Sequence, residues 1–172
     1  CKCAIRYLRA HADKYNIDPD RMAVGGSSAG GHLVALLGTS GGVQELEGHG
    51  GWPEQSSSVQ AVLDLYGPTD FQLFVTTAGY ESHNKDGSPE SRLLGGGEVL
   101  PQTEAIQRVN PITYIDKDDP PFLIIHGSKD ATVPPNQSQV LHAALQKAGV
   151  PSQLHIIDGA GHGGPQFGEP QI

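Results

Sequence analysis

The sequence has little of what marks membrane, nucleic-acid-binding or disulfide-stabilised proteins. No apolar run in its 172 residues approaches the roughly 18 that a helix needs to cross a bilayer, which rules out a membrane span. Lys and Arg number 11 against 19 Asp and Glu, and no basic cluster could neutralise phosphates, which argues against a nucleic-acid partner. The two cysteines, Cys1 and Cys3, would point apart in a helix, so no disulfide framework is expected.

Glycine and proline are abundant instead, with 23 and 13 residues, and several compact apolar runs can form a core. At this length we predict a single domain over residues 1–172 with many loops. The sequence begins at Cys1, inside an amphipathic pattern and without a signal peptide. We therefore expect that the N-terminal part of a longer protein is missing. The sequence does not determine the localisation, and secretion and a periplasmic location both stay open.

The spacing of apolar residues predicts strands that alternate with helices. Helical spacing covers residues 4–15, 28–37 and 136–148, and apolar runs typical of strands cover 22–24, 59–66, 121–126 and 153–157. This alternation predicts an α/β fold, with a parallel sheet and helices on both faces. Residues 67–110 are interpreted as a cap-like insertion with one helix start, where Ser88 caps and Pro89 takes the first helical position.

The pentapeptide Gly26-Ser27-Ser28-Ala29-Gly30 is a G-x-S-x-G motif between a predicted strand and a predicted helix. A sharp turn at this point would lift Ser28 above the sheet and requires small neighbours. A serine hydroxyl becomes a useful nucleophile when a base removes its proton and donors stabilise the oxyanion. The N-terminus of the following helix favours negative charge there. By itself, the motif also fits a structural turn that packs a helix on a strand.

Two further motifs follow later strands. Asp130 lies in the sequence HGSKD after residues 121–126, and His162 lies in GAGHGG after residues 153–157. Open α/β sheets build their sites at the carboxyl ends of strands, where Asp130 could orient the imidazole of His162. Alone, each residue also fits a turn or a surface loop. Together, the order Ser28, Asp130, His162, each after a separate strand, is the order that α/β-hydrolases use.

With these motifs the chain resembles α/β-hydrolase carboxylesterases of the type found in bacterial feruloyl and acetyl-xylan esterases, the Bacteroidetes feruloyl-esterase-like group. The similarity runs from residue 1 to about residue 164 and is carried by IDPDRMAVGGSSAGGHLVALLGTS, VQAVLDLYGPTDF, SPESRLLGG, NPITYIDKDDPPFLIIHGSKDATVP and LHIIDGAGHG. It implies the C-terminal half of an α/β-hydrolase fold. It also implies that Ser28 is the nucleophile, His162 the general base and acid, and Asp130 the residue that orients His162.

The resemblance implies a serine carboxylesterase that needs no cofactor. Its expected substrates are short acyl or hydroxycinnamoyl esters, either small molecules or esters linked to plant polysaccharide. By the same similarity, the Ala29 amide would supply half of the oxyanion hole, and Val133 and Phe71 would line the substrate pocket. The remaining histidines, His126 included, show no ligand spacing, so no metal site is predicted.

One departure from the family pattern concerns the oxyanion hole. Family members carry an HGGG-type loop before the nucleophile, and no such motif precedes Ser28 here. Because one missing oxyanion donor typically costs about 10²–10³ in turnover, we expect weak or no activity from this chain alone. The missing N-terminal strands would leave an exposed sheet edge, through which copies could associate as a homo-oligomer. Two alternatives stay open: a prolyl-oligopeptidase-like serine peptidase, and an association module without a working site.

Overall fold

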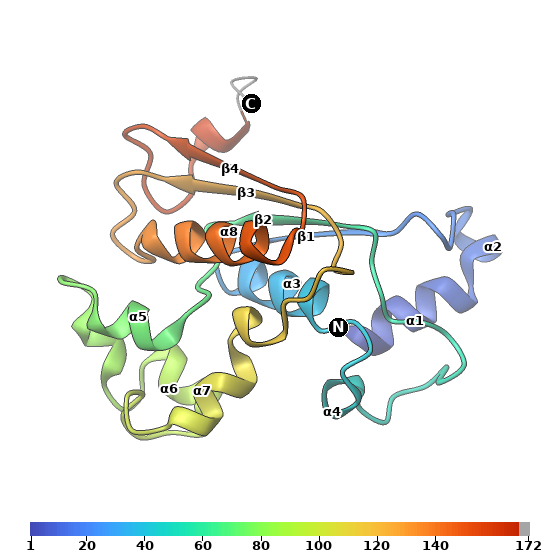
Figure 1. The fold of residues 1–172 in the computed structure, drawn as a ribbon, viewed down its shortest axis with the longest axis horizontal. Helices are drawn as coiled ribbons and strands as arrows, with labels where there is room; N and C mark the ends of the chain where they lie inside the picture. The colour runs from blue at the N-terminus through green and yellow to red at the C-terminus, as the bar shows by residue number, and fades with distance from the viewer. Residues whose placement is uncertain (169–172) are drawn as a thin grey trace.

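Four parallel strands form a single sheet in the computed structural model, which describes residues 1–168 (Figure 1). The strands are β1 (Ala23–Ser27), β2 (Ala61–Leu65), β3 (Phe122–Gly127) and β4 (Ser152–Ile157), in the spatial order β1-β2-β3-β4. The helices are α1 (Lys2–Ala10), α2 (Ala12–Tyr15), α3 (Ala29–Thr39), α4 (Gln44–Glu47), α5 (Phe71–Thr76), α6 (Pro89–Leu94), α7 (Thr103–Val109) and α8 (Asn136–Ala148), with 3₁₀ turns η1 (Glu81–Asn84), η2 (Pro111–Tyr114) and η3 (Pro165–Gly168). Association of copies through the β1 edge stays a prediction.

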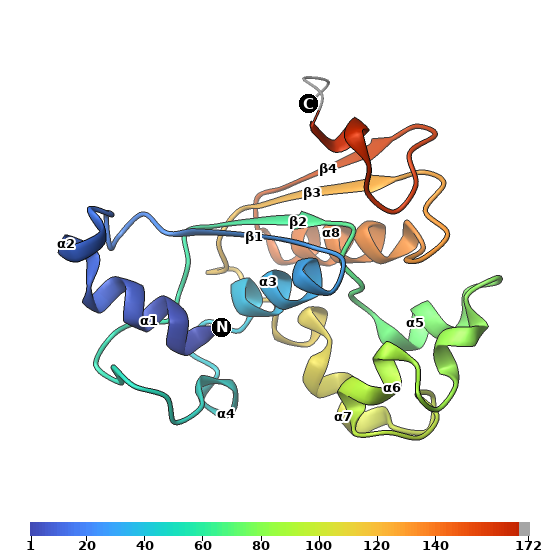
Figure 2. The ribbon, with the colours of Figure 1, turned by 180° about the vertical axis from the view of Figure 1, so that it is seen from behind.

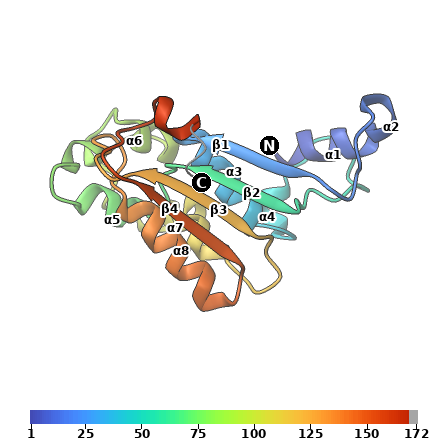
Figure 3. The same cartoon turned by 90° about the horizontal axis from the view of Figure 1, so that it is seen from above.

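The two long helices share one face of the sheet. Helix α3 packs on β1 and β2, and α8 packs on β3 and β4. Both lie below the sheet in Figure 1, and Figure 2 shows the same layering from behind. The view in Figure 3 shows the opposite face of the strands in front of these helices. The predicted α/β class with a parallel sheet is confirmed, but α3 and α8 do not lie on opposite faces. Crossovers between parallel strands are right-handed as a rule, and the two that contain α3 and α8 move along the sheet in the same direction, which puts their helices on the same side.

The main core lies between this face of the sheet and the two helices. The strand side chains Val62, Phe122 and Ile124 are at most 3 % exposed. They pack with Leu141 of α8 and with residues of α3. Gly38 allows α3 to approach the sheet, because a Cβ there would lie 2.5 Å from Cγ2 of Val62. The predicted apolar runs therefore form the strands because their side chains supply this core.

The region predicted as one helix over residues 4–15 forms two. Helix α1 ends before His11, whose backbone has φ −117° and ψ 26°, and α2 ends at Asn16 in the left-handed conformation. The His11 ring Nδ1 hydrogen-bonds with the Tyr7 carbonyl at 2.8 Å. The His11 backbone amide donates to the same carbonyl at 3.1 Å, so the side-chain contact adds to the regular helical hydrogen bond at the break.

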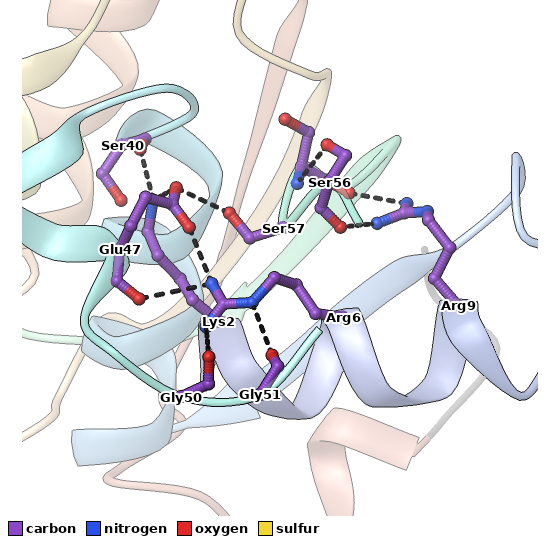
Figure 4. A network of polar contacts seen from close by, with 10 residues as sticks. Lys2, Arg6, Arg9, Ser40, Glu47, Gly50, Gly51, Ser56 and Ser57 are labelled. Carbon is purple, nitrogen blue, oxygen red and sulfur yellow. Dashed lines mark hydrogen bonds and ion pairs between the residues drawn. The ribbon is translucent and has the colours of Figure 1, made fainter. Parts of the chain in front are cut away.

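Buried cations tie α1 to the long loop between α3 and β2 (Figure 4). Lys2 donates to the Ser40 carbonyl at 2.6 Å and to the Glu47 carboxylate at 2.7 Å, and Arg6 donates to the other Glu47 oxygen at 2.8 Å. Burial would raise the pKa of Glu47, but hydrogen bonds from Lys2 and Ser57 and the two positive charges outweigh it and lower the pKa. The loop is therefore fixed by charge pairing as well as by apolar packing.

The segment over residues 67–110 contains three short helices and its own apolar cluster. Ser88 caps α6 as predicted, accepting from the Ser91 amide at 3.0 Å, and Asp70 caps α5 in the same way. The sequence pattern does not predict α5 and α7, because helices of six and seven residues span less than two turns of periodicity. The cluster consists of Phe71, Phe74, Val75, Val99 and Ile106 of this segment, joined by Val133 from the loop after β3. A capping role of this segment stays a prediction.

Candidate active site

Ser28 lies on the turn that joins β1 to α3. Its backbone has φ 55° and ψ −123°, a conformation that residues other than glycine rarely adopt. The Ser28 amide donates to the Leu65 carbonyl of β2 at 2.9 Å, which holds the turn against the sheet. A Cβ on Gly26 would lie 2.2 Å from the Gly30 carbonyl oxygen, whereas a Cβ on Gly30 would meet no described atom within 4 Å. The tight turn therefore requires glycine at Gly26 and not at Gly30.

Asp130 lies in the loop after β3, with its side chain buried. Its Oδ1 accepts hydrogen bonds from the amides of Thr132 at 2.8 Å and Val133 at 2.9 Å. Burial alone would raise the pKa of Asp130. Hydrogen bonds from His126, the Val133 amide, His162 and the Thr132 amide outweigh burial and lower the pKa to about 2. Asp130 is therefore a carboxylate at neutral pH.

His162 follows β4 and connects the other two predicted residues. Its Nδ1 lies 2.7 Å from Oδ2 of Asp130, and its Nε2 lies 2.8 Å from Oγ of Ser28. Because a carboxylate only accepts, we assign the proton to Nδ1, which leaves Nε2 to accept the Ser28 hydroxyl proton. A Cβ on Gly127 would lie 2.4 Å from the Ala160 carbonyl oxygen, so glycine at the end of β3 lets the His162 loop approach.

The three side chains form a continuous hydrogen-bonded chain from a buried carboxylate to a hydroxyl. In such an arrangement the imidazole can take the hydroxyl proton while the carboxylate stabilises the imidazolium. Ala29 is the first residue of α3, where backbone amides lack partners within the helix and point toward an anion. The structure thus brings Ser28, Asp130 and His162 together and puts the Ala29 amide beside Ser28.

The side chains of the predicted pocket residues Val133 and Phe71 are buried in apolar surroundings. Their side chains are 4 % and 2 % exposed, and both belong to the apolar cluster of the 67–110 segment. Phe71 also stacks on His32 of α3, with 5.1 Å between ring centroids. Side chains buried to this extent offer little surface to a ligand, and the assignment of these two residues to a substrate pocket stays a prediction.

Two residues near the site were not among the sequence-based candidates. Tyr66 has φ 47°, and its ring edge lies against His162, with 4.7 Å between centroids. His126 is fully buried, with Nε2 at 3.2 Å from Oδ2 of Asp130. Each is the last residue of a predicted strand, and this position is the signal that could have identified both.

Within residues 1–168, no group of three or more His, Cys, Asp or Glu side chains is arranged to hold a metal ion. In the same range, no helix combines the length and the apolar character needed to span a bilayer.

Known proteins resemble the chain over almost its whole length. Esterase LipC of Mycobacterium tuberculosis is 33 % identical over 94 % of this chain. A truncated form of a carbohydrate esterase from gut microbiota is 36 % identical and superposes with a TM-score of 0.89 over 99 % of this chain. An acetyl ester-xyloside bifunctional hydrolase from Caldicellulosiruptor lactoaceticus is 29 % identical, with a TM-score of 0.78 over 99 % of the chain.

The chain is shorter than these relatives. It spans 39 % of the length of LipC, 62 % of the gut carbohydrate esterase and 58 % of the bifunctional hydrolase. The family model BD-FAE matches residues 1–145, a range that contains Ser28 and Asp130 but ends before His162. Because this match covers most of the sequence and agrees with the fold, the chain belongs to the BD-FAE family of α/β-hydrolases.

Proposed function

We propose that this chain carries the catalytic centre of a serine carboxylesterase. The observation that carries the proposal is the unbroken hydrogen-bonded chain, with 2.8 Å from Ser28 to His162 and 2.7 Å from His162 to Asp130. Three residues far apart in sequence have no structural need for this linear arrangement. It is the arrangement that activates a hydroxyl for acyl transfer.

The proposed reaction proceeds through an acyl-enzyme. Ser28 Oγ attacks the ester carbonyl while Nε2 of His162 takes its proton, and the Ala29 amide donates to the developing oxyanion. The imidazolium then protonates the leaving alcohol. A water molecule, deprotonated by His162, releases the acid and restores the Ser28 hydroxyl. Throughout, Asp130 keeps His162 oriented and stabilises its positive charge.

The proposed substrates are short acyl or hydroxycinnamoyl esters linked to plant polysaccharide. This choice is supported by two relatives, a carbohydrate esterase and an acetyl ester-xyloside bifunctional hydrolase. The structure of a 29 % identical esterase of Thermogutta terrifontis has propionate bound, which supports a short acyl group. The 67–110 segment is the proposed cap over the ester, because the Tyr80 hydroxyl donates to the Asp130 carbonyl and thus joins this segment to the site.

Covalent labelling tests the proposed nucleophile without requiring turnover. A fluorophosphonate probe should label the wild-type chain and the Ser27→Ala variant, and should not label Ser28→Ala. Ser27 is a matched control because it is the neighbouring serine and ends β1. Labelling that persists in Ser28→Ala, or that is absent from the wild type, would refute the proposed nucleophile and favour the association module.

A substrate panel distinguishes the esterase from the peptidase alternative, to which a 24 % identical relative named an uncharacterized peptidase of Bacillus subtilis gives some support. We expect at most slow hydrolysis of p-nitrophenyl acetate and of methyl ferulate, because the sequence has no HGGG-type loop before Ser28 to complete the oxyanion hole. A peptide anilide should stay intact. Cleavage of the anilide at a comparable rate would instead favour the peptidase.

A further inference from the structure

Two imidazoles contact the same oxygen of Asp130. His162 Nδ1 lies 2.7 Å from Oδ2, and His126 Nε2 lies 3.2 Å from the same atom. The His162 side chain is 22 % exposed and faces Ser28, whereas the His126 side chain is 0 % exposed. The proposed mechanism uses the first imidazole and leaves the second without a role.

The neighbours of His126 determine its protonated nitrogen. Its Nε2 hydrogen-bonds to the Val133 carbonyl at 2.9 Å and lies close to Oδ2 of Asp130, and both of these oxygens only accept. We therefore assign the proton to Nε2. Its Nδ1 lies 2.7 Å from Oγ of Ser138 on α8, so the serine hydroxyl donates to it. Both ring nitrogens have partners, and the ring is fixed between the loop after β3 and helix α8.

We propose that His126 is a positioning residue that holds Asp130 in the geometry needed to orient His162. The turn that carries the carboxylate is held at two points. The Val133 amide donates to Oδ1 of Asp130, and the Val133 carbonyl accepts from His126. His126 thus fixes the far end of this turn while its Nε2–H lies against Oδ2.

The surroundings of His126 are consistent with this role. The titratable groups that face it are Asp130, the buried carboxyl of Asp64 on β2, and Tyr66, whose ring centroid lies 6.4 Å away. The contact with His126 is also among the causes that lower the pKa of Asp130. A neighbour that favours the ionised carboxylate helps to keep it ready to accept from His162.

Substitutions of His126 can distinguish a role as hydrogen-bond donor from a role that only fills space in the core. His126→Phe keeps a buried ring without a donor, and we expect kcat for p-nitrophenyl acetate to fall about 10²-fold, as when a reacting group is misplaced by about 1 Å. KM should change little, because His126 is buried away from solvent. His126→Gln can place an amide N–H near the position of Nε2 and should recover most of the activity. Leu141→Ala, in the core on α8, is the control for lost stability and should keep wild-type kcat per folded molecule.

A spectroscopic measurement tests the inference separately from the proposed esterase function, on which it rests. The proton shared by His162 Nδ1 and Asp130 should give a low-field, slowly exchanging NMR resonance in the wild type and in His126→Gln. This resonance should be absent in His126→Phe. If a fluorophosphonate probe does not label the wild type, the proposed function fails while this resonance still decides the role of His126.

The outcomes that overturn the inference are specific. Wild-type kcat and an unchanged resonance in His126→Phe would overturn it, as would equal losses per folded molecule in His126→Phe and Leu141→Ala. If His126→Phe does not fold, Ser138→Ala replaces it, because that change releases the ring from α8. A reduced kcat together with faster exchange of the shared proton would then support the inference, and wild-type values would overturn it.

Discussion

The buried carboxyl of Asp64 should make the stability of this protein fall as the pH rises. Asp64 lies on β2 with no exposed surface, and its Oδ1 accepts from the Gly67 amide at 2.9 Å. Among the described residues, its Oδ2 has no hydrogen-bond partner. Burial raises the pKa of Asp64 from 3.8 to about 6, although the Gly67 amide and nearby His126 act in the opposite direction.

The sign of the effect follows from the two pKa values. Unfolded Asp64 loses its proton near pH 4, whereas folded Asp64 keeps it until about pH 6. Between these values the unfolded state binds fewer protons, so raising the pH favours unfolding. The difference of about two units between the folded and unfolded pKa values corresponds to about 3 kcal/mol of stability. This stabilisation is present in full below about pH 4 and is lost above about pH 6.

Asp64→Asn removes this titration while keeping the shape of the side chain. The amide oxygen can still accept from Gly67, but the new NH₂ group lies where Oδ2 has no partner, which costs about 1–3 kcal/mol at every pH. The change in stability between about pH 4 and about pH 8 therefore isolates the ionisation. We expect that change to be about 3 kcal/mol smaller in Asp64→Asn than in the wild type.

Urea unfolding followed by circular dichroism across this pH range measures the difference. Asp119→Asn is the matched control. Partial burial, together with repulsion from neighbouring aspartates, also raises the pKa of Asp119 to about 6, although the Asp116 amide lowers it. Because Asp119 is partly exposed to solvent, its substitution should have a smaller effect. The reasoning is refuted if Asp64→Asn and the wild type lose stability in parallel as the pH rises.

Three further predictions concern the site and its supports. Asp130→Asn should lower kcat for p-nitrophenyl acetate about 10⁴-fold. The folded Asp130 carboxyl titrates near pH 2, so the unfolding free energy of the wild type should fall by about 2 kcal/mol relative to this variant between about pH 5 and pH 2. Parallel changes in the two proteins would contradict a lowered pKa of Asp130. Gly26→Ala should abolish fluorophosphonate labelling, whereas Gly30→Ala should retain it, because of these two positions a Cβ clashes only at Gly26. Equal labelling of the two variants would contradict the tight turn at Ser28. Glu47→Gln should lower the unfolding free energy in urea by about 3 kcal/mol, because it leaves the two buried cations of α1 without their carboxylate; an unchanged value would show that the carbonyl partners suffice.

Local patterns in the sequence were sufficient for the strands, the longer helices and the three residues of the proposed triad. Apolar runs such as residues 121–126 form strands because their side chains are buried on the sheet, and the helix over residues 136–148 ends at Gly149 in the left-handed conformation, as its sequence predicts. Ser28, Asp130 and His162 could be identified because each follows a strand. Parallel strands bring such residues to one edge of the sheet, whatever the details of packing.

Features that depend on contacts between distant segments could be determined only from the tertiary structure. The side on which α3 and α8 pack follows from the order of strands in the sheet, which no single segment encodes. Val133 and Phe71 are apolar in sequence, but only the packing of the 67–110 segment shows that they are buried together. His126 occupies an ordinary strand position, and its contact with Asp130 arises because the loop after β3 folds back over it and α8 presents Ser138 to its ring. Periodicity reports which face of an element is apolar, whereas hydrogen bonds between segments depend on distances that exist only in the folded chain.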